Sequence, residues 1–112
     1  MSHSQEYIKQ INNYMSVGDA KKLSAYFDDR LDLTFNDKTQ KCSRKQAIVL
    51  LENYFSKQDI ILFELTHKGD SKSNHTQYLI GNLKTKTGEY KVYFFFIQKK
   101  DKYYIKELRF GN

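Results

Sequence analysis

Cysteine, proline and tryptophan are scarce or missing in this chain of 112 residues, which has one cysteine, no proline and no tryptophan. The single cysteine, Cys42, excludes an internal disulfide and a cysteine-rich metal site. No apolar stretch is long enough to span a bilayer, and the N-terminus has no hydrophobic leader. We therefore expect no membrane span. The compartment stays open: cytoplasmic, or exported if a leader has been removed.

Arginine is also scarce, with 3 residues against 16 lysines in a chain of net charge +6. The excess of positive charge lies in the second half, where residues 57–112 hold 11 basic and 6 acidic side chains. Lysines at strand edges discourage edge-to-edge aggregation, which is our first interpretation. The alternative is a module that binds anionic partners through these lysines. Nucleic acid is not the expected partner, because lysine does not give bidentate phosphate or base recognition.

Aromatic residues are plentiful, with 9 tyrosines and 8 phenylalanines. This is more than a minimal core of one small domain needs, so we expect some of them to line an interface or a pocket. The length fits one domain, residues 1–112, with a single hydrophobic core.

In the second half of the chain, apolar and polar residues alternate as they do in β-strands. The pattern predicts four consecutive strands joined by short turns. We predict these strands at Ile60–Lys68, His75–Lys84, Glu89–Gln98 and Tyr103–Phe110. The first half predicts helices at Ser4–Val17, Ala20–Phe27 and Arg44–Ser56, and a strand at Leu31–Phe35. The predicted order is α-α-β-α-β-β-β-β, an α+β fold with three helices packed on a curved antiparallel sheet, cone-like in shape.

Several short signals set the boundaries of these elements. Gly18 is placed to end the first helix, and Asp19 to cap the second. Ser43 and Gln46 match a capping box for the third helix. Asp28 and Asp29 are expected to form a turn, and residues 36–41 a polar turn.

The strand Glu89–Gln98 is apolar on both of its faces. One face carries Tyr90, Val92, Phe94 and Phe96, and the other carries Tyr93, Phe95 and Ile97. A strand with one solvated face should alternate apolar and polar residues. Because the helices can cover only one face, we expect a homodimer whose interface contains Tyr93, Phe95 and Ile97. The alternative is a sheet so strongly curved that it covers its own second face.

Taken together, these segments resemble the nuclear-transport-factor-2-like (cystatin-like) α+β superfamily over nearly the whole chain. The residues that carry the resemblance are Gly18-Asp19-Ala20 with Leu23, Tyr26-Phe27-Asp28-Asp29, Leu31–Phe35, Ser43-Arg44-Lys45-Gln46-Ala47 and Phe55. Within that superfamily, His67-Lys68-Gly69 and the run from Tyr78-Leu79-Ile80-Gly81-Asn82-Leu83 to Gly88-Glu89-Tyr90 look like an uncharacterised bacterial family of small, often exported proteins. The superfamily contains enzymes and non-catalytic modules, so the fold does not set the function.

The resemblance allows one catalytic hypothesis to be examined. Steroid-isomerase-like relatives place a carboxylate base on the first strand, where Asp32 is the nearest acid and Thr34 the better-matching position. They also use a tyrosine of the first helix, a place that Tyr14 could occupy. A second, protonated acid should come from the later strands, but the acids there are at polar positions. The absence of a suitable second acid weighs against the hypothesis that the protein is an isomerase.

For each remaining candidate residue, a functional role is compared with a purely structural one. His67 would share a face with Phe63 and Leu65, as a pocket imidazole or as a strand-end histidine bonded to the backbone. With His75 and Asp70 it makes a poor metal site. Cys42 lies beside basic residues near a helix start, which lowers a thiol pKa, yet no histidine is close in sequence. The candidate ligand-pocket residues are Tyr14, Tyr26, Asp32, Tyr54, His67, Tyr78 and Tyr93.

The sequence thus favours a non-enzymatic module that binds a small apolar ligand or a protein partner, as a homodimer. A cofactor-free enzyme with a Tyr/His/Asp pocket is the main alternative. We assign no catalytic residue, metal or cofactor.

Overall fold

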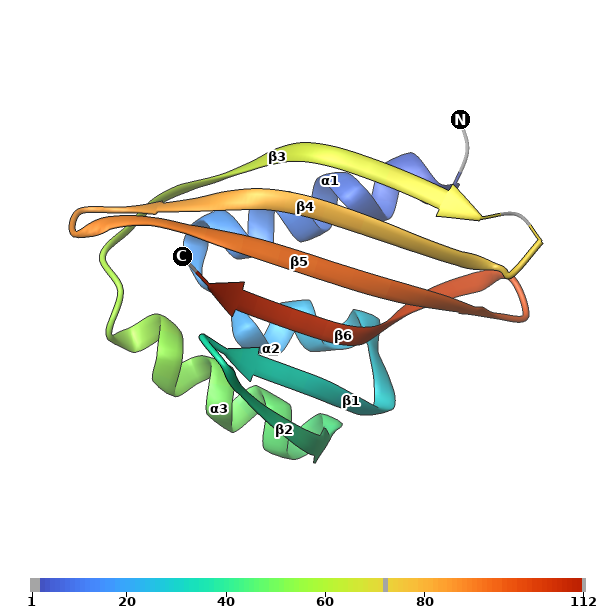
Figure 1. The fold of residues 1–112 in the computed structure, drawn as a ribbon, viewed down its shortest axis with the longest axis horizontal. Helices are drawn as coiled ribbons and strands as arrows, with labels where there is room; N and C mark the ends of the chain where they lie inside the picture. The colour runs from blue at the N-terminus through green and yellow to red at the C-terminus, as the bar shows by residue number, and fades with distance from the viewer. Residues whose placement is uncertain (1–2, 72, 112) are drawn as a thin grey trace.

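The computed structural model describes residues 3–71 and 73–111, and shows three helices packed on one face of a curved six-stranded sheet. The sheet lies in front of the helices in Figure 1 and leaves its other face uncovered by any element described. Strand order is β2-β1-β6-β5-β4-β3. The elements are α1 (His3–Val17), α2 (Ala20–Leu23), η1 (Ser24–Tyr26), β1 (Phe27–Phe35), β2 (Lys38–Ser43), α3 (Arg44–Ser56), β3 (Ile60–Ser71), β4 (Thr76–Thr85), β5 (Gly88–Lys99) and β6 (Lys102–Gly111).

The α+β fold predicted from the sequence is confirmed, and so are the signals at the helix ends. Gly18 has φ +66°, and the next amide, that of Asp19, donates to the carbonyl of Tyr14 at 2.9 Å. Asp19 in turn accepts a bond from the amide of Lys22, which starts α2. Ser43 and Gln46 form the capping box of α3 in both directions.

The second helix is shorter than predicted. Only Ala20–Leu23 is α-helical; a 3-10 turn follows, and β1 begins at Phe27, which was expected to be the last helical residue. Ala20, Leu23 and Phe27 are all buried. All three side chains therefore join the core, although the backbone changes conformation between them.

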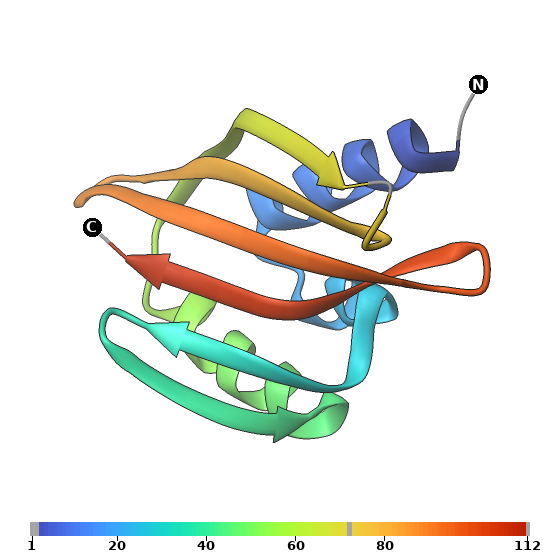
Figure 2. The ribbon, with the colours of Figure 1, turned by 45° about the vertical axis from the view of Figure 1, so that its right-hand side comes forward.

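The sheet contains one strand that the sequence did not predict. Residues 36–41 were expected to form a polar turn, but Lys38–Ser43 forms β2, antiparallel to β1. The turn shrinks to two residues because Asn36 adopts a left-handed conformation with φ +58°. The sheet is also not wholly antiparallel, since β6 pairs with β1 in parallel. Turning the molecule shows the curve of the sheet around the helices, with the β5–β6 hairpin extending at one end (Figure 2).

Aromatic rings fill the space between the helices and the sheet. Phe94 and Phe96 of β5 point inward and are fully buried, as are Phe27 of β1 and Leu79 of β4. The Phe94 ring stacks on that of Phe96 with centroids 6.1 Å apart. Phe94 and Phe96 thus belong to the face of β5 that the helices cover. No helix among the described residues is long and apolar enough to cross a membrane.

Candidate binding surfaces

The uncovered face of the sheet carries an apolar patch at its centre. Tyr93, Phe95 and Ile97 of β5 alternate with buried neighbours and are themselves only partly buried, so they lie on this outer face. On β4, Tyr78 is opposite Phe95 and Ile80 is opposite Tyr93. We call these five residues the outer sheet patch.

Close contacts hold the aromatic side chains of the outer sheet patch in place. The rings of Tyr78 and Tyr93 stack with centroids 6.4 Å apart. Tyr78 covers Gly69 on β3, where an added Cβ would lie 2.4 Å from the ring. The guanidinium of Arg109 lies 5.7 Å from the centroid of the Tyr93 ring, a cation–π contact. Contacts with neighbouring residues of the sheet therefore hold the rings of Tyr78 and Tyr93 in fixed positions.

Charged groups of both signs border the outer sheet patch. On β6, Glu107 accepts a hydrogen bond from Arg109 at 2.9 Å. Asp32 of β1 is opposite Glu107, and Lys41 of β2 is opposite Asp32. The border therefore contains acids and bases within a few ångströms of each other.

A pocket of about 520 Å³ opens where α1, η1 and the β5–β6 hairpin meet. We call it the tyrosine pocket; it is lined by Glu6, Tyr7, Gln10, Ala25, Tyr26, Asp101, Lys102, Tyr103 and Tyr104. The Tyr7 ring lies 5.9 Å from that of Tyr103 and 6.1 Å from that of Tyr26. The Tyr7 ring also makes an edge-to-face contact with the buried ring of Phe96, with centroids 5.4 Å apart.

The hydroxyl of Tyr7 is buried and has no hydrogen-bond partner among the described residues. Burial, with Tyr103 and Asp70 nearby, raises the pKa of Tyr7 far above its ordinary value, so the phenol stays neutral. The hydroxyl of Tyr26, by contrast, bonds to the side-chain oxygen of Gln10. Burial also raises the pKa of Tyr26. Tyr7 and Tyr26 are therefore uncharged parts of the lining, to which Glu6, Asp101 and Lys102 add charged side chains.

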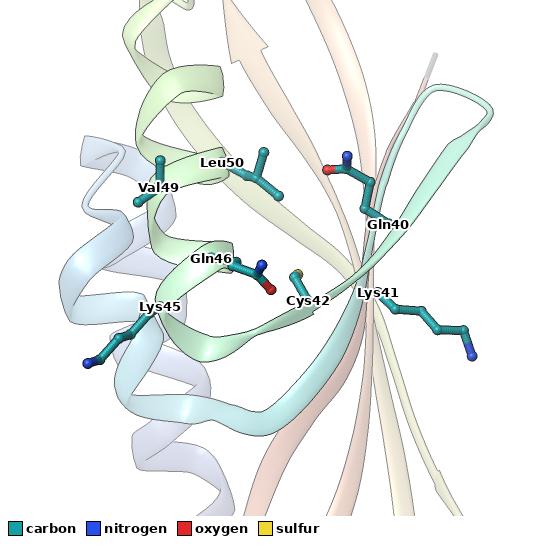
Figure 3. A pocket seen from close by; sticks show the side chains of 7 residues that line it. All are labelled: Gln40, Lys41, Cys42, Lys45, Gln46, Val49 and Leu50. Carbon is teal, nitrogen blue, oxygen red and sulfur yellow. The ribbon is translucent and has the colours of Figure 1, made fainter.

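A second hollow, of about 590 Å³, lies between β2 and α3 beside Cys42. Figure 3 shows the Cys42 side chain directed toward α3, while Lys41 and Lys45 point away from it. The thiol is 2% exposed and lies 3.5 Å from the carbonyl oxygen of Leu31. Burial raises the pKa of Cys42, which corrects the lowering expected from its basic neighbours in sequence.

Asp28 is a buried carboxylate held by two lysines from the far end of the chain. Its oxygens lie 2.6 Å from Lys99 Nζ and 3.2 Å from Lys106 Nζ. Burial alone would raise the pKa of Asp28, but hydrogen bonds from the two ammonium groups and from the Asp29 amide hold it below its ordinary value. Asp28 was expected to form a turn with Asp29; the structure places both in β1, and Asp28 links β1 to the β5–β6 hairpin.

The structure separates the seven candidate pocket residues instead of gathering them. Tyr26 alone lines the tyrosine pocket, while Tyr78 and Tyr93 belong to the outer sheet patch. Tyr54 stacks on Phe35 at 4.9 Å. Tyr14 packs partly buried on α1. Asp32 alternates with the buried Leu31 and Leu33, so it lies on the outer face.

His67 does not share the face of Phe63 that the alternation predicted. A bulge between Leu65 and His67 shifts the register, and the exposed imidazole lies 3.1 Å from the hydroxyl of Thr66. His75 contacts the side chain of Gln98. Within residues 3–71 and 73–111, no three histidine, cysteine or acidic side chains converge as metal ligands would.

Sequence reasoning missed Tyr7 and the hairpin residues of the tyrosine pocket. The Tyr7 ring is buried on α1. The hairpin residues Asp101–Tyr104 lie about ninety positions further along the chain. No local pattern indicates that these two segments meet, so the pocket had no signal in the sequence.

Comparison with known proteins shows the family and the fold. Residues 8–111 match the family described as a domain of unknown function, DUF4783. None of the curated proteins matches the chain. A DUF4783 family protein from Bacteroides uniformis is similar in structure, with a TM-score of 0.86, 24% identity, and coverage of 93% of this chain and 94% of that one.

Two further structures support the same conclusion about the fold. A DUF4783 family protein from Bacteroides ovatus gives a TM-score of 0.86 at 22% identity, covering 91% of both chains. A domain of unknown function with a cystatin-like fold from Nostoc punctiforme gives 0.73 at 12% identity, covering 99% of this chain and 78% of that one. At such identities the likeness concerns the fold alone. The cystatin-like fold expected from the sequence is thereby confirmed.

Proposed function

The chain belongs to the DUF4783 family, and we propose that it is a non-enzymatic binding module that forms a homodimer through the outer sheet patch. The observation that carries this proposal is β5, which is apolar on both faces while the helices cover only one. Partly exposed Tyr93, Phe95 and Ile97 together with Tyr78, which is 39% exposed, form a contiguous apolar surface. Surfaces of this kind, bordered by polar groups, are typical of protein interfaces.

The charges around the patch favour a second copy of the chain as the partner. In a two-fold interface the same surface faces itself, so a border of one sign would repel its copy. Here Glu107 and Asp32 lie beside Arg109 and Lys41 on neighbouring strands. A two-fold rotation can place acids opposite bases, which makes the border self-complementary.

The positions of the candidate acid–base groups favour binding over catalysis. Proton-transfer chemistry would need at least two titratable groups converging in a closed cavity. Asp32 lies on the outer face, whereas Tyr14 belongs to α1 on the opposite side of the sheet. The space between helices and sheet is occupied by Phe94, Phe96 and their neighbours.

Light scattering on the purified chain tests the proposed dimer. At micromolar concentration we expect a mass of twice the 13.4 kDa of one chain. Phe95→Glu places a charge at the centre of the patch and should raise the dimer Kd about 30-fold or more, as expected for a central apolar contact. The matched control is Val49→Glu on α3, where an apolar side chain is 64% exposed.

The control protein should remain a dimer, because Val49 lies on α3 behind the sheet. Circular dichroism of both variants separates loss of association from loss of folding. A wild-type mass near that of one chain at micromolar concentration would contradict the proposal. So would a Phe95→Glu protein that is folded and still dimeric.

A further inference from the structure

We propose that the outer edge of β2 binds an extended acidic segment of a partner protein, which pairs with β2 as an additional strand of the sheet. Alternate side chains of this segment enter the hollow between β2 and α3. We call the edge and the hollow together the β2 groove; Figure 3 labels the residues that line the hollow. The β2 groove shares no residue with the outer sheet patch, so its test is separate from that of the proposed dimer.

The position of β2 in the sheet leaves one of its edges without a neighbouring strand. β2 is the outermost strand on its side and pairs with β1 alone. The amide of Asn36 donates to the carbonyl of Phe110 on β6 at 2.7 Å, so the preceding residue, Phe35, turns its backbone groups toward β2. Phe35 is opposite Lys38, and these two residues therefore form a hydrogen-bonded pair.

The alternation of an antiparallel pair then directs every second residue of β2 away from β1, namely Thr39, Lys41 and Ser43. The Ser43 amide is bonded to the side-chain oxygen of Gln46. Among the described residues, none bonds to the outward backbone groups of Thr39 and Lys41. These two residues offer two amides and two carbonyls to an added strand.

The opposite edge of the sheet is protected against strand addition. On β3, the Ser16 hydroxyl lies 2.9 Å from the amide of Phe63 and 3.4 Å from its carbonyl oxygen. Two register shifts also interrupt β3, and irregularities of this kind prevent continuous pairing. β2 has no register shift along Lys38–Ser43 and is the better template.

The hollow beside β2 can receive the side chains of an added strand. Figure 3 shows Gln40 and Cys42 on the side of β2 that faces α3, and Lys41 on the other side. On α3, Val49 is 64% exposed and Leu50 is partly buried. Since the side chains of a strand alternate, every second residue of the segment would contact Val49 and Leu50, and apolar residues suit these positions.

The charges of the β2 groove favour an acidic segment. The charged residues that line the hollow are Lys41 and Lys45, and Lys38 begins the strand. None of the three forms an ion pair within the described part of the chain. Asp32, opposite Lys41, and Asp37, in the turn, offset part of this charge and leave an excess of lysine. Acids on the partner would complement it.

A second copy of the chain fits this edge poorly. Two β2 strands paired about a two-fold axis would bring together Lys38 and Lys41 of each copy, while Lys38–Ser43 contains no acid. The lysines that discourage pairing between copies are thus the groups that favour an acidic segment. A partner of opposite charge is the occupant that the edge selects.

The test uses an acetylated and amidated heptapeptide, Glu-Val-Glu-Val-Glu-Val-Glu, in which acidic and apolar side chains alternate. Isothermal titration calorimetry measures its affinity, and amide NMR shifts should change most in β2 and α3. The matched control has lysine in place of each glutamate and should bind at least about fivefold more weakly, because repulsion replaces attraction. Lys41→Gln combined with Lys45→Gln should reduce this preference.

N-methylated peptides test the backbone pairing on the wild-type protein. Only one edge of an added strand bonds to β2, so the amides of alternate peptide residues are used. One peptide is methylated on its two inner glutamates and another on two of its valines. We expect one of them to lose binding about tenfold or more and the other to bind as the parent does. Equal affinity of the two methylated peptides would overturn the proposal.

Variants of the protein locate the site. Thr39→Pro removes an outward amide, which an edge strand tolerates, and should weaken binding about tenfold or more. Thr39→Val keeps the amide while removing the hydroxyl and should bind as the wild type does. Val49→Glu should also weaken binding, because it places an acid among the apolar contacts. Ile61→Glu on β3 changes a residue of similar exposure, 59%, and should have no effect.

Three results would contradict the proposal. One is equal binding of the acidic and basic peptides by the wild type. Another is a Thr39→Pro protein that is folded by circular dichroism and binds the acidic peptide as the wild type does. The third is loss of the dimer in Thr39→Pro, which would assign the edge to a second copy. If Thr39→Pro fails to fold, the methylated peptides still decide, since they use the wild-type chain.

Discussion

At the scale of single residues, Asp28 shows how a carboxylate is kept charged inside a fold. Its side chain is 6% exposed, whereas those of Lys99 and Lys106 are about half exposed. The lysines therefore lower the pKa of the carboxyl while remaining in contact with water themselves. Lys106 also donates to the carbonyl of Arg30, so the cluster joins side chain and backbone at the start of β1.

Replacing this carboxylate should destabilise the protein in a pH-dependent way. The folded-state pKa of Asp28 is lowered, so its contribution is present above the unfolded pKa of about 3.9 and is lost as pH falls through the folded pKa. We expect Asp28→Asn to reduce the free energy of unfolding by about 1 kcal/mol at neutral pH. Urea unfolding at several pH values measures the difference, which should shrink below about pH 4.

Asp29→Asn is the matched control. The Asp29 side chain is 87% exposed and its contact with Arg44 is 3.3 Å long. An exposed pair of this kind contributes little, so this variant should differ from the wild type by less than about 0.5 kcal/mol. Equal effects of the two substitutions would show that the buried cluster does not stabilise the fold.

The different roles of Asp28 and Asp29 could not be predicted from the sequence. Two adjacent acids between a helix and a strand fit a turn, and the sequence does not indicate which basic residue pairs with either of them. The distinction arises because Lys99 lies 71 positions away and reaches Asp28 only when β6 has paired with β1. Tyr7 poses the same difficulty, since its orphan hydroxyl is set by a distant hairpin.

At the scale of elements, β3 and β4 pack closely against each other at Gly81. A Cβ added there would lie 2.3 Å from the Phe63 ring and 2.7 Å from the carbonyl oxygen of Glu64. The Phe63 ring cannot move freely, because it packs edge-on against Phe94 at 6.0 Å. The absence of a side chain at Gly81 thus lets Phe63 enter the core.

Gly81→Ala should therefore reduce the stability of the protein. Overpacking a rigid site of this kind costs about 2 kcal/mol, because both the ring and the backbone would have to shift. Gly111→Ala on β6 is the control, since nothing lies within 4 Å of the added atom. Thermal unfolding of the two variants should show a clear drop in Tm for the first alone. A Gly81→Ala protein as stable as the wild type would mean that β3 can move away from β4.

The elements that the sequence predicts best are those with a strong apolar pattern. β5 is apolar on both faces, and the strand lies where its pattern predicted it. β2 was missed because Lys38–Lys41 are all exposed, and Cys42 is its one buried side chain. An edge strand held by backbone pairing, with the Thr34–Thr39 hydroxyl contact at 2.8 Å, leaves almost no apolar signal. The bulge after Leu65 likewise depends on pairing with β4.

At the scale of the whole molecule, the positive charge of the sheet is partly neutralised by neighbouring acids. Several basic groups of the sheet are paired with acids, such as Lys84 with Glu64 at 3.5 Å and Arg109 with Glu107 at 2.9 Å. Lys99 and Lys106 share Asp28. Paired charges of this kind interact weakly with a polyanion, which weighs against binding to anionic partners through the sheet lysines.

Heparin chromatography distinguishes these alternatives. We expect elution at low salt and a slope of log Kobs against log salt shallower than about −3, because Lys84, Lys99, Lys106 and Arg109 of the sheet are already paired with acids and displace fewer counterions. Lys84→Gln should change the elution little. Retention above physiological salt with a steep slope would instead support the anionic-partner alternative.

The position of β6 has a consequence for biosynthesis. The β1–β2 hairpin and the β3–β4–β5 meander touch each other in the sheet only through β6, which pairs with β1 on one side and β5 on the other. While a ribosome is making the chain, both halves of the sheet can be complete before the strand that joins them has emerged. Each half would meanwhile expose an unpaired edge, a site at which nascent chains could associate wrongly. Folding of the whole sheet must therefore await the last strand, and its many long-range pairings should make that step slow.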